Sequence, residues 1–330
     1  MKIEKSIAVL RLPEYSTGMV EVNKCVVNNL KFTCVVNSVN KLEAIKSLVS
    51  FSKKSRSPKL YMVAPVNMKG YLWVFLVSLI LRPSEAFFHV HNRSFQLNIW
   101  LKFVLKFCGE ISLIFLSNKL ALIKTHTTYN IFIVPNFSKL EKEFLLNRSA
   151  KDYLRVGYLG NFIKAKGYDK VLNLRDSLDS NISISIAGRF LTKKDKLNFY
   201  ASRSNQILLN KVDWNDEGIY GEDLEDFYTH LDVLLFPTIY KHEAFPLVIL
   251  EALAHGCYII AYDTGGIADI LKEEWIGLCV DDESFIGSVK DLEGSEYMTE
   301  GYRKKRMEYY RNNYSKQKFL NTMEKVLEIY

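Results

Sequence analysis

Several features that would place this chain of 330 residues in a familiar class are absent from it. The five cysteines are scattered and form no C-x-x-C pair, so the sequence indicates neither a disulfide framework nor a cysteine-based zinc site. A reducing compartment, the cytoplasm, is therefore expected. We expect no signal peptide, because the first residues lead directly into a strand-like run. The longest apolar run, residues 71–81, has about half of the ~20 residues that a membrane-spanning helix needs.

Acidic residues are scarce in the first half of the chain. Residues 1–150 contain 21 basic and 8 acidic side chains, a balance of +13, whereas residues 151–330 contain 23 and 29, a balance of −6. A basic half favours an acidic partner, such as anionic lipid headgroups, a phosphorylated acceptor or nucleic acid. Nucleic acid is not expected, because the basic residues are spread out and no known binding module is present.

The apolar segment 66–82 has basic residues nearby, among them Arg82, Arg93, Lys102 and Lys106. One interpretation is a core helix under a parallel sheet. The other is a patch on a membrane surface, where the protein would meet a lipid-linked acceptor.

The composition, with 48% hydrophobic and 25% charged residues, is that of an ordinary globular protein, and the length indicates two domains. Strand-like runs alternate with helical stretches in both halves, which predicts parallel sheets with ligands bound beyond the carboxyl ends of the strands. The run 231–237 is nearly all apolar, as in a strand buried on both faces. Helices are predicted at residues 41–54, 221–230 and over the last thirty or so residues, strands at 59–63 and 206–212, and the tip of a turn at Gly18.

The segment 236–266, FPTIYKHEAFPLVILEALAHGCYIIAYDTGG, organises the chain. It predicts a strand, a loop, a helix whose first residue is Pro246, a second strand and a turn. The backbone amides of Phe245, Leu247 and Val248 have no partner inside such a helix, and the helix dipole makes their position an anion site. Carboxylates at Glu243 and Glu251 flank this site.

A carboxylate can accept hydrogen bonds from hydroxyl groups of a ligand, but it repels an anion. A sugar joined to a nucleotide by a diphosphate has both the hydroxyl groups and the anion. The alternative is a surface helix with two solvated carboxylates.

Glu243 and Glu251 form a Glu-x7-Glu element that is followed by A-L-A-H-G and D-T-G-G. This pattern resembles the donor site of the GT4-type retaining glycosyltransferases, which have the GT-B fold. The resemblance implies an α/β chain with two Rossmann-like domains whose parallel sheets face a central cleft. It divides the chain into an acceptor-side domain at 1–137, a linker at 138–152, a nucleotide-sugar domain at 153–312, and a helix at 313–330 that crosses back onto the first domain.

The same resemblance assigns site residues. The first Glu of the family element contacts the transferred sugar and the second the ribose. The octapeptide G-N-F-I-K-A-K-G at 160–167 resembles the family pattern G-R-x-x-x-x-K-G, in which Arg and Lys hold the diphosphate. Lys166 matches the Lys, but Asn161 stands where Arg is usual, so this chain departs from the family's phosphate clamp at that position. His91 takes the place of a histidine that faces the donor sugar. The predicted donor-binding set is completed by Gly18, Gly160, Gly188, Arg189, Ala244, Phe245, Pro246, Leu247 and Val248.

The resemblance implies a retaining transferase that moves a sugar from a UDP- or GDP-sugar to a glycan or lipid-linked acceptor, in the biosynthesis of a lipopolysaccharide or capsule. No cofactor is expected. The chain has no D-x-D motif, so we expect no metal-bridged mechanism. His89 and His91 lack a third ligand, so no zinc site is predicted. The expected localisation is cytoplasmic, or peripheral on the inner face of the plasma membrane. Two alternatives stay open: a non-catalytic partner that binds a sugar nucleotide, and a phosphorylase of the same fold, which the short chain disfavours.

Overall fold

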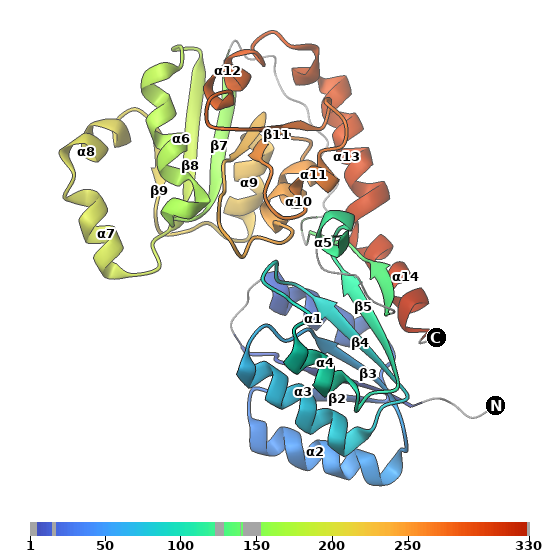
Figure 1. Cartoon of the computed structure of the whole chain (residues 1–330). Helices are drawn as coiled ribbons and strands as arrows, with labels where there is room; N and C mark the ends of the chain where they lie inside the picture. Colours follow the sequence, from blue (N-terminus) through green and yellow to red (C-terminus); the bar gives the residue numbers. More distant parts are fainter. Residues whose placement is uncertain (1–4, 15–17, 123–128, 139, 141–152, 329–330) are drawn as a thin grey trace. The chain divides into compact units, whose positions relative to one another are not determined.

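The computed structural model describes residues 5–14, 18–122, 129–138, 140 and 153–328. The chain forms two compact units (Figure 1): unit 1 comprises Met1–Phe137 and Lys316–Tyr330, and unit 2 comprises Ser138–Ser315. Each unit contains one six-stranded sheet with helices, so the predicted α/β class is confirmed. The predicted linker at 138–152 lies almost entirely outside the described residues.

Unit 1 contains a parallel sheet in the order β2-β1-β3-β4-β5-β6. Its strands are β1 (Ser6–Leu10), β2 (Cys34–Asn37), β3 (Lys59–Val63), β4 (Glu85–Val90), β5 (Glu110–Phe115) and β6 (Asn130–Ile133). Its helices are α1 (Gly18–Asn29), α2 (Lys41–Lys54), α3 (Met68–Leu81), α4 (Ile99–Leu105), α5 (Asn118–Leu122) and α14 (Lys316–Leu327). All five residues of β1 are buried, as expected for a strand that is covered on both faces.

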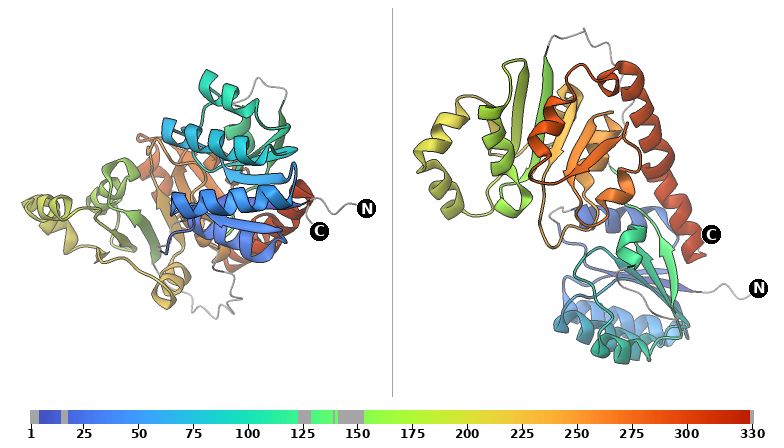
Figure 2. Two further views of the ribbon diagram at one scale, coloured as in Figure 1. Left: turned by 90° about the horizontal axis from the view of Figure 1, so that it is seen from below. Right: turned by 45° about the horizontal axis from the view of Figure 1, so that its top comes forward.

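Helices cover both faces of this sheet. On one face, Val26 of α1 and Met323 of α14 belong to a single apolar cluster with Phe87 of the sheet. Right-handed crossovers put α2, α3 and α4 on the other face, where they lie side by side (Figure 2). The last helix of the chain therefore completes the core of unit 1.

Helix α3 occupies most of the apolar segment 66–82. It buries Val74, Val77 and Leu81, which confirms that it is a core helix. The same helix leaves Leu72 and Leu79 exposed, at 61% and 40%. The apolar residues on one side of α3 thus pack in the core of unit 1, and those on the other side are exposed to solvent. Within the described ranges, we find no helix with the length and apolar character needed to cross a bilayer.

Unit 2 contains a parallel sheet in the order β12-β11-β10-β7-β8-β9. Its strands are β7 (Leu154–Asn161), β8 (Ile182–Arg189), β9 (Asp213–Asn215), β10 (Val233–Phe236), β11 (Tyr258–Tyr262) and β12 (Gly277–Val280). Its α-helices are α6 (Tyr168–Leu174), α7 (Lys193–Tyr200), α8 (Arg203–Leu209), α9 (Glu222–His230), α10 (Leu247–Ala254), α11 (Ile267–Ile270), α12 (Phe285–Lys290) and α13 (Glu300–Tyr314). Three short 3-10 helices are η1 (Lys164–Lys166), η2 (Arg175–Ser177) and η3 (Glu296–Met298).

The strand order of unit 2 determines where a ligand can bind. Strand β7 lies inside the sheet; β8 and β9 follow outward on one side, and β10, β11 and β12 lie on the other. The direction of winding reverses between β7 and β10. Open parallel sheets bind their ligands at such a switch point, beyond the carboxyl ends of the strands.

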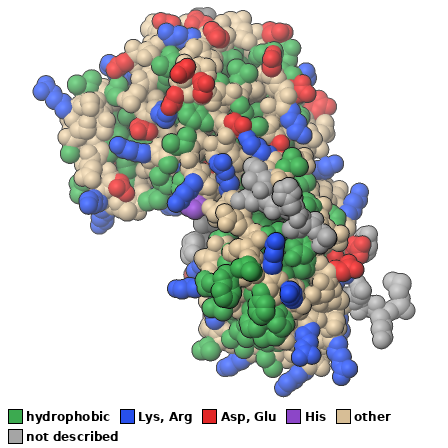
Figure 3. All heavy atoms as spheres, viewed as in Figure 1, with side chains coloured by type: hydrophobic (Ala, Val, Ile, Leu, Met, Phe, Trp, Pro, Cys, Tyr) green, Lys and Arg blue, Asp and Glu red, His purple; other side chains and the backbone are tan. Residues whose placement is uncertain are grey.

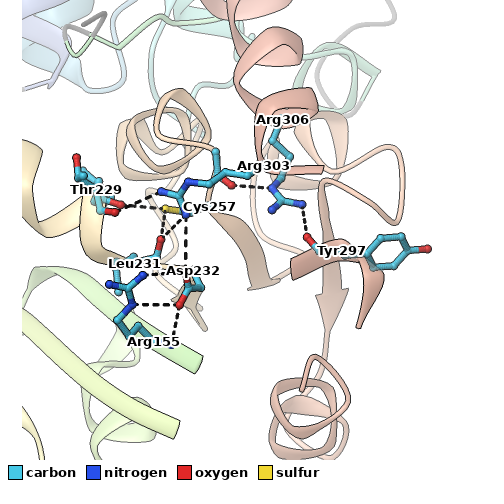
Figure 4. Close-up of polar contacts among 10 residues, drawn as sticks. Arg155, Thr229, Leu231, Asp232, Cys257, Tyr297, Arg303 and Arg306 are labelled. Carbon is cyan, nitrogen blue, oxygen red and sulfur yellow. Dashed lines mark hydrogen bonds and ion pairs between the residues drawn. The ribbon is translucent and has the colours of Figure 1, made fainter. Parts of the chain in front are cut away.

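Two buried arginines hold α13 against the rest of unit 2 (Figure 4). The guanidinium of Arg306, 2% exposed, donates hydrogen bonds to the carbonyls of Gly256 (2.8 Å), Tyr297 (2.9 Å) and Trp275 (3.0 Å). Arg303, 4% exposed, donates to other carbonyls of the unit. Burial lowers the pKa of Arg306 to about 10, so the group is still charged at neutral pH. The helix is thus fixed by charge-assisted hydrogen bonds from two buried guanidinium groups.

Two local predictions were wrong. Residues 206–212 do not form a strand, because the chain there folds into α8, whose N-cap Ser202 accepts a hydrogen bond from the amide of Asn205. Helical spacing buries Leu208 and leaves Ile207 at 52% exposure. Gly18, predicted at the tip of a turn, is instead the first residue of α1, and residues 15–17 before it lie outside the described part.

Candidate functional site

Three loops of unit 2 meet at the carboxyl ends of β7, β10 and β11. The amide of Ile239, after β10, donates to the carbonyl of Ala165, after β7, at 2.8 Å. The hydroxyl of Thr264, after β11, donates to the carbonyl of Thr238 at 2.7 Å. Thr238 is fully buried, so the loops are joined beneath the surface. These contacts form one rigid platform at the switch point of the sheet.

Two glycines allow the loops to approach this closely. Gly167 has φ +81°, and a Cβ at this position would lie 2.4 Å from the carbonyl oxygen of Pro237. Gly265 has φ +63°, and a Cβ there would lie 2.5 Å and 2.6 Å from the carbonyl oxygens of Glu243 and Ala244. The glycines of the K-G and D-T-G-G elements are therefore required by the backbone itself.

Lys166 and Glu243 lie together on this platform, although they are far apart in the sequence. Lys166 Nζ is 3.1 Å from Glu243 Oε2, and the two side chains are 20% and 12% exposed. Nζ also lies 5.5 Å from the ring centroid of Tyr240. The ion pair lacks the angles of a hydrogen bond. Oε2, although shielded from solvent, accepts no hydrogen bond from any described residue. A shielded carboxylate oxygen with unused acceptor capacity is suited to a ligand hydroxyl.

Helix α10 begins beside this pair. Its N-cap is Pro246, with φ −71° and ψ 123°, so the predicted first helical position is wrong by one residue: the helix starts at Leu247. Ala244 and Phe245 are buried, so their side chains belong to the protein interior. Leu247 and Val248 are half-buried in the first turn, where backbone amides have no partner within the helix. With the helix dipole, this turn favours an anion.

Glu251 lies in the same helix and is held by a residue that sequence reasoning missed. The hydroxyl of Tyr228 on α9 donates to Glu251 Oε2 at 2.9 Å and lies 3.3 Å from the carbonyl of Val248. Tyr228 is fully buried. Burial, and after it the charge of Glu251, raises the pKa of Tyr228 well above its ordinary value, so the phenol is a permanent donor. The only sequence signal for this tyrosine was its place on the apolar side of a predicted helix.

The remaining predicted donor residues of unit 2 lie on β7 and β8. Gly160 and Gly188 are direct register partners, and a Cβ on Gly188 would lie 2.0 Å from the carbonyl oxygen of Gly160. Gly188 therefore has a packing role. Asn161 and Arg189 form the next register pair, at the carboxyl ends of the two strands. Arg189 is exposed and Asn161 half-buried.

The predicted residues of unit 1 are Gly18, described above, and His91, which directly follows β4. The rings of His91 and His89 have their centroids 3.9 Å apart, and the hydroxyl of Tyr61 lies 2.7 Å from His89 Nδ1. Burial lowers the pKa of His91 to about 4, and burial together with His91 lowers the pKa of His89 well below its ordinary value. Both imidazoles are therefore neutral at pH 7. The role that the resemblance gives His91, orienting the transferred sugar, stays a prediction.

Within the part of the chain that the structure describes, His, Cys, Asp and Glu side chains form no group of three or more that could hold a metal ion. The arrangement in unit 2 is instead a cation and a carboxylate at the mouth of a helix. Such a set can bind a molecule that carries both an anion and hydroxyl groups.

The sequence matches the family described as "Glycosyl transferases group 1" over residues 141–315, more than half of the chain. The chain belongs to this family of glycosyltransferases. Two curated relatives match parts of it. A 41.2 kDa protein in the cps region of Klebsiella pneumoniae is 26% identical over 163 residues, which cover 48% of this chain and 42% of that protein. The glycosyltransferase MJ1607 of Methanocaldococcus jannaschii is 36% identical over 62 residues, 19% of this chain and 15% of that protein. The chain thus spans less than half the length of the curated relatives that it matches.

Solved structures resemble the chain over nearly its whole length. A glycosyltransferase from Rickettsia africae has a TM-score of 0.74 at 13% identity and covers 98% of both chains. HepE of Anabaena, solved in complex with UDP, has a TM-score of 0.73 at 11% identity and covers 98% of this chain and 99% of that one. A sucrose-phosphate synthase from Thermosynechococcus elongatus has a TM-score of 0.71 at 14% identity. These likenesses are of fold, and they confirm the predicted GT-B class with two Rossmann-like domains.

Proposed function

We propose that this glycosyltransferase moves a sugar from a nucleoside diphosphate donor to an acceptor hydroxyl with retention of the anomeric configuration, in the manner of the GT4-type enzymes. The observation that carries the proposal is the Lys166–Glu243 pair at the start of α10, at the switch point of the unit 2 sheet. The relative in a capsule region and the structure of HepE with UDP-glucose support a nucleotide-sugar donor and a cell-surface polysaccharide product.

Each group of the platform has a role in the proposed donor complex. Lys166 and the amides of the first turn of α10 bind the diphosphate. Glu243 accepts hydrogen bonds from hydroxyls of the transferred sugar through its shielded oxygen, and Glu251 accepts from the ribose. Tyr228 orients Glu251 through the 2.9 Å hydrogen bond.

Arg189 offers a physical answer to the missing arginine at position 161. Directly paired residues of neighbouring parallel strands point to the same side of a sheet. Asn161 and Arg189 form such a pair, and Arg189 is exposed at the strand end. We propose that Arg189 supplies the second cation for the diphosphate, from the strand next to the one that carries it in the family pattern.

In the proposed reaction, the bond between the anomeric carbon and the β-phosphate oxygen breaks, and its electron pair goes to the diphosphate. The acceptor hydroxyl oxygen bonds to the anomeric carbon on the same face, and its proton passes to the departing phosphate oxygen. Such a reaction does not need the two carboxylates of a glycosidase. Charge builds on the leaving group, so Lys166 and the helix amides act where the transition state needs them.

A two-stage experiment tests the proposal. Thermal-shift measurements with UDP, GDP, ADP and their sugars should identify the donor, because a ligand that binds only the folded chain raises its melting temperature. Transfer or hydrolysis of that donor should then fall at least ~100-fold in Lys166→Ala and in Glu243→Ala. Lys194→Ala, which removes an exposed lysine on α7, is the matched control and should retain activity.

Near-normal turnover in Lys166→Ala or Glu243→Ala would remove that residue from the reaction. If the wild-type chain binds a donor but neither transfers nor hydrolyses its sugar, the alternative of a non-catalytic sugar-nucleotide-binding protein is favoured. The observation that supports this alternative is Asn161, which stands where the family pattern has Arg. In Arg189→Ala, donor affinity should fall; an unchanged affinity would show that Arg189 does not contact the diphosphate.

A further inference from the structure

Unit 1 exposes a continuous apolar surface on the outer side of α3 and α4. We define the α3–α4 patch by its large apolar side chains, which are Met68 (49% exposed), Leu72 (61%), Leu79 (40%), Ile99 (79%), Trp100 (60%), Phe103 (52%) and Phe107 (36%). Over the described ranges, every exposed phenylalanine and tryptophan belongs to this patch. Figure 3 shows hydrophobic side chains gathered on one face of unit 1. Monomeric proteins rarely expose an apolar patch larger than a few hundred Å² unless it binds something.

The patch is built as one rigid surface. Phe75 of α3 packs against Phe107 with ring centroids 5.0 Å apart and against Phe103 at 6.4 Å. The Asn98 side chain caps α4 by accepting from the amide of Leu101, and its Nδ2 donates to the hydroxyl of Tyr71 on α3 at 3.0 Å. The exposed aromatic rings are thus held in place from below.

The surroundings of the patch are predominantly basic. Residues 44–109 contain ten basic side chains and a single acidic one, Glu85. Glu85 is half-buried, lies 3.7 Å from Lys59 and accepts a hydrogen bond from Ser112, so its charge is compensated within unit 1. Lys69 and Arg82, near the two ends of α3, and Lys102 and Lys106, at the end of α4, are exposed. Long basic side chains with apolar stems can reach phosphate groups while the rings enter the acyl boundary.

We propose that the α3–α4 patch binds a membrane surface that contains anionic lipid headgroups. The charge decides between possible occupants. Two copies of the patch facing each other would bring mainly like charges together, which opposes a homodimer through this face. Anionic headgroups are complementary in charge to the basic side chains, and Trp and Phe side chains partition favourably into the interfacial region of a bilayer. The proposal does not depend on the transfer reaction, since it concerns only unit 1.

Vesicle co-sedimentation of the full chain tests the proposal. The chain should bind phosphatidylcholine vesicles that contain phosphatidylglycerol, should bind vesicles of phosphatidylcholine alone much more weakly, and should lose affinity as salt is raised. Replacing both lysines at the end of α4, as Lys102→Gln with Lys106→Gln, should lower the partition coefficient about 25-fold, since each basic residue near an anionic surface contributes about fivefold. Replacing the rings, as Trp100→Ser with Phe103→Ser, should lower it at least ~tenfold.

The matched control is Leu191→Ser with Leu197→Ser in unit 2, where the side chains are 58% and 71% exposed. It should bind vesicles like the wild-type chain. Circular dichroism and melting temperature verify that each variant is folded. Equal binding to both kinds of vesicle, or wild-type binding by both patch variants, would overturn the proposal. A dimer in light scattering that the ring variant converts to a monomer, with no vesicle binding by either, would overturn it in favour of a self-association surface.

Discussion

The geometry of the Lys166–Glu243 pair predicts a measurable coupling in stability, independent of any reaction. At 3.1 Å and an effective dielectric constant of about 20, the Coulomb attraction is about 5 kcal/mol. Desolvation of two groups that are only 20% and 12% exposed offsets a large share of it. A double-mutant cycle with Lys166→Met and Glu243→Gln, which change charge more than volume, should therefore give a coupling of about 1–3 kcal/mol.

Native-state hydrogen exchange of the amides of β10 suits this cycle, because it reports the opening free energy of unit 2 by itself. Each single variant should lose stability, since the partner charge stays shielded and unpaired, and the double variant should lose less than the sum. A second cycle that combines Lys194→Met with Glu243→Gln should show no coupling. A coupling below about 0.5 kcal/mol for the first cycle would mean that the two charges do not meet as described.

Three further predictions concern other parts of the molecule. Tyr228→Phe removes the hydroxyl that orients Glu251, and should raise KM for the donor about tenfold or more while kcat changes little, because a hydrogen bond to a charged group contributes about 1.5–3 kcal/mol; an unchanged KM would exclude this positioning role. Burial lowers the pKa of His91 from its ordinary 6.5 to about 4 in the folded chain. The unfolded chain therefore binds this proton more readily between pH 6.5 and 4, and the free energy of unfolding falls as the pH is lowered through that range. Urea midpoints measured across this range should therefore fall, and less steeply in His91→Gln; parallel curves would contradict the assignment. Arg306→Met leaves three carbonyls without their donor and should destabilise unit 2 by about 3–5 kcal/mol, with no rescue by Arg306→Lys, as read by calorimetry; a loss under 1 kcal/mol would show that water replaces the guanidinium.

The local elements that sequence predicts best are those whose pattern has one interpretation. The strand Lys59–Val63 and the helix Lys41–Lys54 appear with their predicted bounds, because flanking residues and apolar spacing agree there. The segment 206–212 contains adjacent apolar residues that fit a strand and a helix equally, and the serine cap decided between them.

Some residues of the candidate site could likewise be predicted from the sequence, and others could not. Lys166, Glu243 and Glu251 stand at the ends of predicted strands or in a predicted helix, so topology alone brings them to one edge of the sheet. Tyr228 could not be found, because a tyrosine on an apolar helix side gives no sign of the carboxylate that it meets from another helix. Nor could the exposed side of α3 be predicted, since apolar residues occupy its whole circumference.

The return of α14 to unit 1 affects the order in which the chain can fold. Phe319, Met323 and Leu327 are 3%, 0% and 1% exposed, and all belong to the cluster beneath α1. During synthesis, all residues of unit 2 have been made once residue 315 is added. Residues 1–137 of unit 1 keep an apolar face uncovered until α14 has been synthesised. A fragment that ends at residue 137 should therefore aggregate, and one that spans 138–315 should be the portion that reaches its native state unaided.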